Sequence, residues 1–205
     1  HFHVTEQAYV ELLAPWVDGE TASAALLETE RRNLALFGYG VKGFTLSMIE
    51  TALALTEHRI DGAHIERIIS LGKALLDHPV ELIDGVSDTI DLLGESHRLV
   101  LITKGDLFHQ ESKVAASGVA ERFERIEIVA EKDPGTYSRV LAAMGAAPSE
   151  FCMIGNSVRS DIAPVLELGG AGVHVPYHVT WALEHAVIEE SHPRLARIAQ
   201  ISDAP

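Results

Sequence analysis

The most informative stretch of the chain is Cys152-Met153-Ile154-Gly155-Asn156-Ser157-Val158-Arg159-Ser160-Asp161. A short apolar run ends in Gly-Asn-Ser, and Asp161 follows on what the pattern predicts to be the first turn of a helix. In open α/β sheets, ligands bind just outside the carboxyl ends of the strands. Asn156 and Asp161 can both present oxygen there, which suits a hard cation such as Mg²⁺. The alternative is a polar strand-to-helix turn in which Asp161 interacts only with the helix dipole.

Two other predicted strands end in polar residues of a complementary kind. Residues 97–102 form an apolar, β-rich run that stops at Thr103-Lys104, and residues 126–130 stop at Glu131-Lys132. A hydroxyl and an ammonium group can hold phosphate oxygens, while the oxygens near Asn156 hold a cation. Because phosphoryl transfer needs charge neutralisation and positioning above all, this combination indicates that chemistry.

The patterns along the chain predict an α/β protein with two parts. Residues 1–78 show four helical patterns and no strand alternation, which is typical of a small helical bundle. From Pro79 to Pro205 strands and helices alternate, which predicts a Rossmann-like parallel sheet with helices on both faces. We therefore expect a helical domain over 1–78 and an α/β core domain over 79–205.

The order Thr103, then Lys132, then Gly155-Asn156 through Asp161 resembles motifs two, three and four of the haloacid dehalogenase-like (HAD) hydrolase superfamily. The resemblance covers most of the chain, and it implies that the helical domain is a cap over the active site. It also implies attack by an Asp nucleophile on a phosphoryl group, giving an aspartyl-phosphate that water hydrolyses with the help of Mg²⁺.

The chain departs from this resemblance at the first motif, an Asp-x-Asp loop after the first strand of the core. No apolar strand followed by paired Asp residues occurs upstream of Thr103, and Asp84-Gly85-Val86-Ser87-Asp88 has the wrong spacing. Either a strand and nucleophile loop precede His1 in the natural protein, or this copy is catalytically dead. We expect the first case, and hence no hydrolase activity in a protein that starts at His1.

The most unusual segment of the predicted cap is Phe37-Gly38-Tyr39-Gly40-Val41-Lys42-Gly43-Phe44. Three glycines around an aromatic residue and a lysine suggest a loop that approaches a substrate closely, with Tyr39 and Lys42 as its contacts. The alternative is an ordinary connection between helices with glycine C-caps.

Composition narrows the range of partners. The chain has 205 residues and a formal net charge of -14, a surface that repels nucleic acid and anionic membranes. No apolar run reaches transmembrane length. Cys152, in a strand predicted to be buried, is the one cysteine, so no disulfide can form within the chain, which fits a cytoplasmic protein. The oligomeric state has no signature in the sequence.

The leading hypothesis is a Mg²⁺-dependent phosphatase of a small phosphorylated metabolite. Thr103, Lys104 and Lys132 would bind the phosphate, with Thr103 and Lys132 as catalytic residues, and Asn156 and Asp161 would hold the metal. A 2-haloacid dehalogenase, which uses the same kind of Asp ester without a metal, is the second hypothesis. The third is a non-catalytic binding protein that kept the fold and lost the nucleophile.

Overall fold

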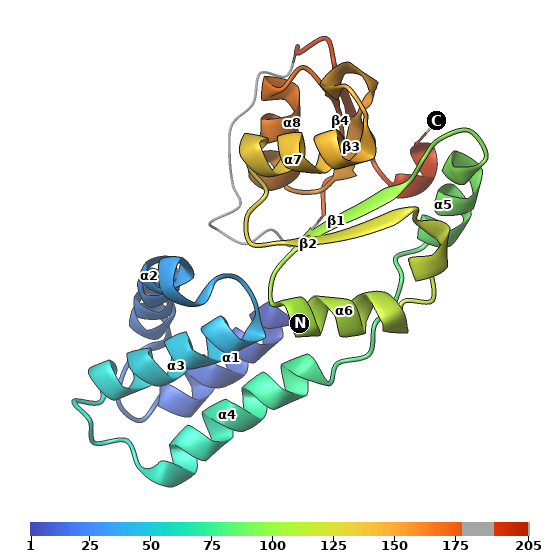
Figure 1. Cartoon of the computed structure of the whole chain (residues 1–205). Helices are drawn as coiled ribbons and strands as arrows, with labels where there is room; N and C mark the ends of the chain where they lie inside the picture. Colours follow the sequence, from blue (N-terminus) through green and yellow to red (C-terminus); the bar gives the residue numbers. More distant parts are fainter. Residues whose placement is uncertain (178–190, 205) are drawn as a thin grey trace. The chain divides into compact units, whose positions relative to one another are not determined.

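Four helices open the chain in the computed structural model, which describes residues 1–177 and 191–204 (Figure 1). Asp18 and Asp61 cap two of them, because their carboxylates accept the Thr21 and His64 backbone N–H groups at 2.9 and 3.0 Å. The four helices predicted for this region are confirmed as α1 (Phe2–Leu13), α2 (Gly19–Phe37), α3 (Val41–Leu55) and α4 (Gly62–Leu76).

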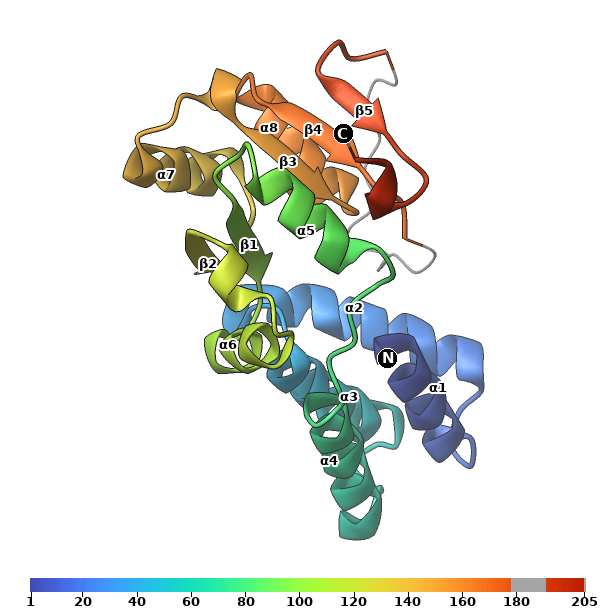
Figure 2. The same cartoon turned by 90° about the vertical axis from the view of Figure 1, so that its right-hand side faces the viewer.

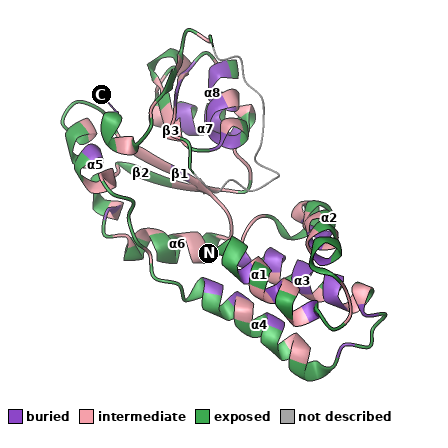
Figure 3. Ribbon diagram, turned by 180° about the vertical axis from the view of Figure 1, so that it is seen from behind, coloured by how far each residue is buried: buried purple, intermediate pink, exposed green. Residues whose placement is uncertain are grey.

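These helices enclose a core of their own. Tyr9 and Met48 are fully buried, and the Tyr9 hydroxyl donates a hydrogen bond to the Met48 carbonyl at 3.0 Å. Figure 3 colours the buried residues of this bundle, among them Leu13, Leu26 and Ile68. Residues 1–80 together with 105–110 form one compact unit, and 81–104 together with the residues from 111 onward form a second.

The second unit alternates strands and helices. Its elements are α5 (Val86–Gly94), β1 (Val100–Lys104), β2 (Arg125–Val129), α7 (Pro134–Met144), β3 (Cys152–Gly155), a π-helix (Val158–Ile162), α8 (Ala163–Glu167), β4 (Ala171–His174) and β5 (Leu195–Arg197). Helix α6 (Leu107–Ala116) begins in the 105–110 segment, which packs with the first unit. Short 3₁₀ turns cover Ala120–Arg122, Pro148–Glu150 and Ile201–Asp203.

Every strand pair in the described chain is parallel, as the sequence predicted. The strands form two hydrogen-bonded sheets, β1-β2 and β3-β4-β5, where one sheet was expected. Side chains join the two sheets: Ile102 of β1 and Met153 of β3 belong to one hydrophobic cluster with Tyr137 and Val140 of α7 and Val165 of α8. Helices α7 and α8 lie on one side of the strands and α5 on the other (Figures 1 and 2).

Two local expectations were wrong, and a third was confirmed with a different type of first turn. Strand β1 extends to Lys104, so Thr103 and Lys104 lie within the strand and not after it. Cys152 is exposed, because it opens β3, the end strand of its sheet in the described chain. The helix expected after β3 starts as a π-helix before it continues as α8. Among the described residues, no helix combines the length and apolarity needed to cross a bilayer.

Candidate active site

An ion pair between Lys132 and Asp161 stands at the centre of the candidate site. Lys132 follows β2, Asp161 lies on the π-helix after β3, and the Lys132 Nζ lies 2.7 Å from the Asp161 Oδ1. Their side chains are only 11% and 6% exposed, so water screens this pair little. The structure therefore brings together two predicted site residues that stand 29 positions apart.

The loop after β3 fixes the second oxygen of Asp161. The Ser157 backbone N–H donates to Asp161 Oδ2 at 2.9 Å, and the Asp161 backbone N–H donates to the Ser157 carbonyl at 2.8 Å. Both carboxylate oxygens thus accept a hydrogen bond, which is what a buried carboxylate requires.

Gly155 makes room for this carboxylate. A Cβ built on Gly155 would lie 2.5 Å from the Asp161 Cγ and 2.6 Å from its Cβ, closer than non-bonded atoms approach. The backbone of Gly155 has no positive φ, so the absence of a side chain, and not conformational freedom, is what the site uses.

Lys104, at the end of β1, contacts the same loops. Its Nζ donates to Ser160 Oγ at 2.7 Å and lies 3.2 Å from Glu131 Oε1. The same Glu131 oxygen accepts the Lys132 backbone N–H at 2.9 Å. The ends of β1, β2 and β3 are therefore connected through side chains, with two ammonium and two carboxylate groups.

Tyr137, on α7, contacts the π-helix that carries Asp161. Its hydroxyl donates to the Ser160 carbonyl at 2.9 Å. Burial raises the pKa of the Tyr137 phenol, and the Asp161 charge raises it further. The phenol is therefore a neutral hydrogen-bond donor throughout the physiological pH range.

Asn156 and Asp161 are the residues whose oxygens could hold Mg²⁺. Asn156 is exposed, and its backbone carbonyl accepts a hydrogen bond from His174 Nε2 at 3.1 Å. Each oxygen of Asp161 has two lone pairs. The contacts to Lys132 and Ser157 use one lone pair on each oxygen, so a second remains on each for a metal ion. One carboxylate and one amide fit Mg²⁺ in the sparse form in which it keeps several waters. Among the described residues, no cluster of three or more His, Cys, Asp or Glu could hold a metal.

Of the remaining predicted site residues, Thr103 lies at the carboxyl end of β1, and Tyr39 and Lys42 lie in the first unit. Thr103 precedes Lys104 in β1, opposite Ile128 of β2. Tyr39 and Lys42 belong to the first unit, where the Lys42 Nζ lies 2.9 Å from Asp106 Oδ2. The Lys42 side chain is 60% exposed. The roles of these residues in binding stay predictions.

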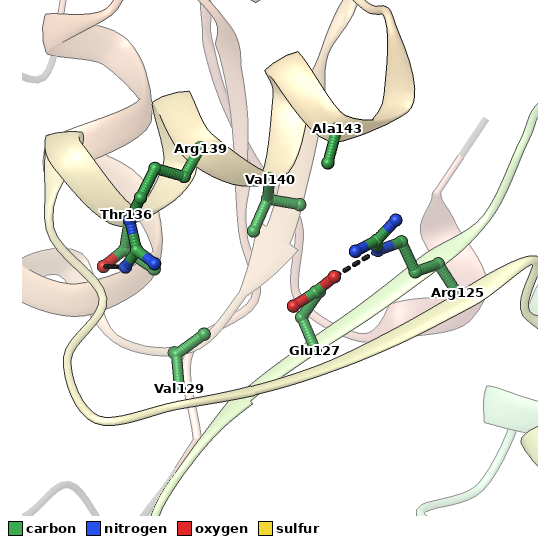
Figure 4. Close-up of a pocket in the computed structure, with 7 residues that line it drawn as sticks. All are labelled: Arg125, Glu127, Val129, Thr136, Arg139, Val140 and Ala143. Atoms are coloured by element: carbon green, nitrogen blue, oxygen red, sulfur yellow. Dashed lines mark hydrogen bonds and ion pairs between the residues drawn. The ribbon is translucent and has the colours of Figure 1, made fainter.

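A separate cavity of about 140 Å³ lies between β2 and α7 (Figure 4). It is lined by Arg125, Glu127, Val129, Thr136, Arg139, Val140 and Ala143. None of the predicted site residues is among them. Arg125 is paired with Glu127, and Arg139 donates to Thr136 Oγ1, so these polar side chains of the cavity lining bind one another.

Sequence reasoning missed four residues of the site. Glu131 and Ser160 are the immediate neighbours of Lys132 and Asp161, and this adjacency was the one available signal for them. Tyr137 fits an ordinary apolar helix position, so its pattern carried no such signal. Gly155 was part of the motif that carries the resemblance, but it was given no role of its own.

The chain matches known hydrolases. Residues 3–169 match the family model described as a haloacid dehalogenase-like hydrolase. A crystal structure of a haloacid dehalogenase-like family hydrolase from Xanthomonas campestris shares 46% identity and a TM-score of 0.88, over 98% of this chain and 80% of that one. The chain therefore belongs to the haloacid dehalogenase-like hydrolases. No curated protein matches the chain.

More distant solved structures share the fold alone. A 2-haloacid dehalogenase from Pseudomonas syringae pv. Tomato has 19% identity and a TM-score of 0.61, over 97% of this chain and 87% of that one. A predicted phosphoglycolate phosphatase from Haemophilus somnus has 13% identity and a TM-score of 0.58, over 88% of each chain.

Proposed function

We propose that this haloacid dehalogenase-like hydrolase is a phosphatase that cleaves the phosphoric monoester of a small metabolite. The observation that carries the proposal is the largely buried Lys132 ammonium, which follows β2 and is held by Asp161 at 2.7 Å. Ammonium groups fixed in a site of low exposure stabilise a developing anion more strongly than they would in water.

In the proposed reaction a carboxylate oxygen attacks phosphorus and the ester P–O bond breaks. The leaving alkoxide takes a proton to give the alcohol. Water then attacks the acyl-phosphate, which releases inorganic phosphate and restores the carboxylate. The segment from His1 to Thr103 contains no Asp-x-Asp. We therefore assign no residue as the nucleophile, and trapping of the acyl-phosphate would identify the carboxylate that attacks.

The residues of the site have separate roles in this scheme. Lys132 neutralises charge on the phosphoryl group, and Asp161 holds the Lys132 ammonium in place at 2.7 Å. Thr103 would donate its hydroxyl to a phosphoryl oxygen. Asn156 and Asp161 would hold Mg²⁺, which when bound supplies further neutralisation of phosphoryl charge. Tyr39 and Lys42 would contact the organic part of the substrate.

A test of this proposal uses the protein expressed from its complete reading frame. We expect turnover of a generic aryl phosphate with Mg²⁺, loss of most of that turnover with EDTA, and an acid-stable acyl-phosphate trapped by rapid quenching. Absence of both turnover and a trapped intermediate would contradict the phosphatase proposal.

A metal-independent dehalogenase is the second candidate, and one feature of the site favours it. Lys132 already compensates the charge of Asp161, and Asn156 is neutral, so the site carries little negative charge for a cation. Halide release from a 2-haloacid in the presence of EDTA, without aryl phosphate turnover, would favour this candidate. Phosphate binding without either activity would favour a binding protein.

A further inference from the structure

The Lys104 ammonium lies inside the protein, in contact with Ser160 and Glu131. Its side chain is 13% exposed, and its ammonium donates to Ser160 Oγ at 2.7 Å while pairing with Glu131 at 3.2 Å. The contact to Ser160 spans 56 positions in sequence. Because Ser160 is only 3% exposed, water has little access to replace the ammonium as its partner.

Ser160 uses its backbone and side chain to connect three elements. Its N–H donates to Ser157 Oγ at 3.0 Å, its carbonyl accepts from the Tyr137 hydroxyl at 2.9 Å, and its hydroxyl oxygen accepts from Lys104. The residue that follows is Asp161. A shift of Ser160 would therefore move the carboxylate that pairs with Lys132.

The local backbone needs such support. The Ile162 N–H donates to the Ser157 carbonyl at 3.2 Å and the Ala163 N–H donates to Val158, so both bonds span five residues. Such π-turns are rare, occur as single turns within helices, and are frequent at functional sites. Asp161 lies within this wide turn, and its side chain contacts Gly155.

We propose that Lys104 is a positioning residue that acts through Ser160, holding the π-helix in the register that presents Asp161 to Lys132. The sequence alone predicted that Lys104 binds phosphate directly. The contact of Lys104 with Ser160, the residue before Asp161, is what favours positioning. The kinetic part of this inference rests on the proposed phosphatase function, and the structural part does not.

Two substitutions test the assignment. Lys104→Met keeps a side chain of similar length and removes the donor, and Ser160→Ala removes only the acceptor. We expect hydrogen exchange at the Ile162 and Ala163 amides to become about tenfold faster in each variant, as local opening becomes easier. Lys113→Met, at an exposed position on α6, is the matched control and should leave these rates unchanged.

Kinetics separate positioning from phosphate binding. We expect kcat with an aryl phosphate to fall about 10- to 100-fold in both variants, with KM and the inhibition constant for inorganic phosphate changed less than about threefold. The Lys104→Met/Ser160→Ala double variant should lose no more than the worse single variant, because both remove the same link.

Three results would overturn the assignment. The first is a rise of about tenfold in the inhibition constant for phosphate in Lys104→Met with kcat preserved, which would make Lys104 a phosphate ligand. The second is multiplication of the two single effects in the double variant. The third is unchanged amide exchange. If Lys104→Met does not fold, Ser160→Ala alone decides. If the wild-type protein has no phosphatase activity, the exchange rates still decide the structural part.

Discussion

Two regions carry the predicted site residues, and they hold their charges differently. At the ends of β1, β2 and β3, Lys104, Lys132 and Asp161 are nearly buried. Lys104 contacts Ser160 and Glu131, and the Asp161 carboxylate contacts Lys132 and the Ser157 N–H. In the first unit, Lys42 lies in the first turn of α3, is 60% exposed and pairs with Asp106, whose side chain is 25% exposed. The first region holds its charges in fixed, largely buried positions, whereas the second is a surface ion pair of the kind that contributes little to stability.

Lys132→Met is expected to have the largest effect on stability and turnover. It leaves Asp161 charged, buried and without its ammonium partner, which costs about 3–5 kcal/mol of unfolding free energy. Turnover should fall about 1000-fold, at the upper end for loss of one stabilising donor. Denaturant unfolding and aryl phosphate kinetics measure the two effects.

A second variant separates charge from chemistry at this position. Lys132→Met/Asp161→Asn leaves no uncompensated charge, and the Asn amide oxygen can still accept the Ser157 N–H. We expect it to regain most of the lost stability and none of the activity. Lys73→Met, exposed on α4, is the control and should change neither. Wild-type turnover in Lys132→Met would remove Lys132 from the mechanism.

Gly155→Ala tests the packing of the same region. The new Cβ would overlap the Asp161 side chain, so the carboxylate must move or the strand end must shift. We expect a loss of stability of about 1–3 kcal/mol and a fall in kcat of about 100-fold. Gly62→Ala is the matched control, since no atom lies within 4 Å of a Cβ at Gly62. Equal effects in the two variants would show that the close approach at Gly155 has no consequence.

Lys42→Ala tests the exposed ion pair of the first unit. Because the Lys42–Asp106 pair is exposed, we expect a change in unfolding free energy within about 0.5 kcal/mol. If Lys42 contacts substrate as proposed, KM should rise several-fold with little change in kcat. Steady-state kinetics at low and high salt would measure this, and an effect as large as that of Lys132→Met would end the contrast between the two regions.

The smallest expected effect is a pH dependence of the Lys42–Asp106 pair. The hydrogen bond from Lys42 holds the pKa of the Asp106 carboxyl below its usual range, and the His109 backbone N–H lowers it further. A depressed pKa in the folded state means that the stabilisation is present above the unfolded pKa and is lost as pH falls through the folded value. NMR titration of Asp106 should give a higher pKa in Lys42→Ala than in the wild type. An unchanged value would mean that the pair does not persist in solution.

Most of the helices and strands, and two residues of the central ion pair, could be predicted from local sequence patterns. Hydrophobic periodicity separates four helices from an alternating α/β region, and Asp61 begins α4 as a helix-capping residue should. Lys132 and Asp161 were identified because polar residues follow apolar strands, and parallel strands deliver their carboxyl ends to one edge. These signals are local, so a single sequence carries them.

The contacts between side chains could not be predicted from the sequence and became known from the tertiary structure. The contacts of Lys132 with Asp161 and of Lys104 with Ser160 depend on strand register and on side-chain rotamers, which no local pattern specifies. The π-turn depends on partners outside its own segment, and Gly155 is explained by a carboxylate six residues further along the chain. The split of the strands into two sheets follows from backbone hydrogen bonds between segments far apart in sequence. Long-range geometry of this kind is set by packing, and packing is a property of the whole fold.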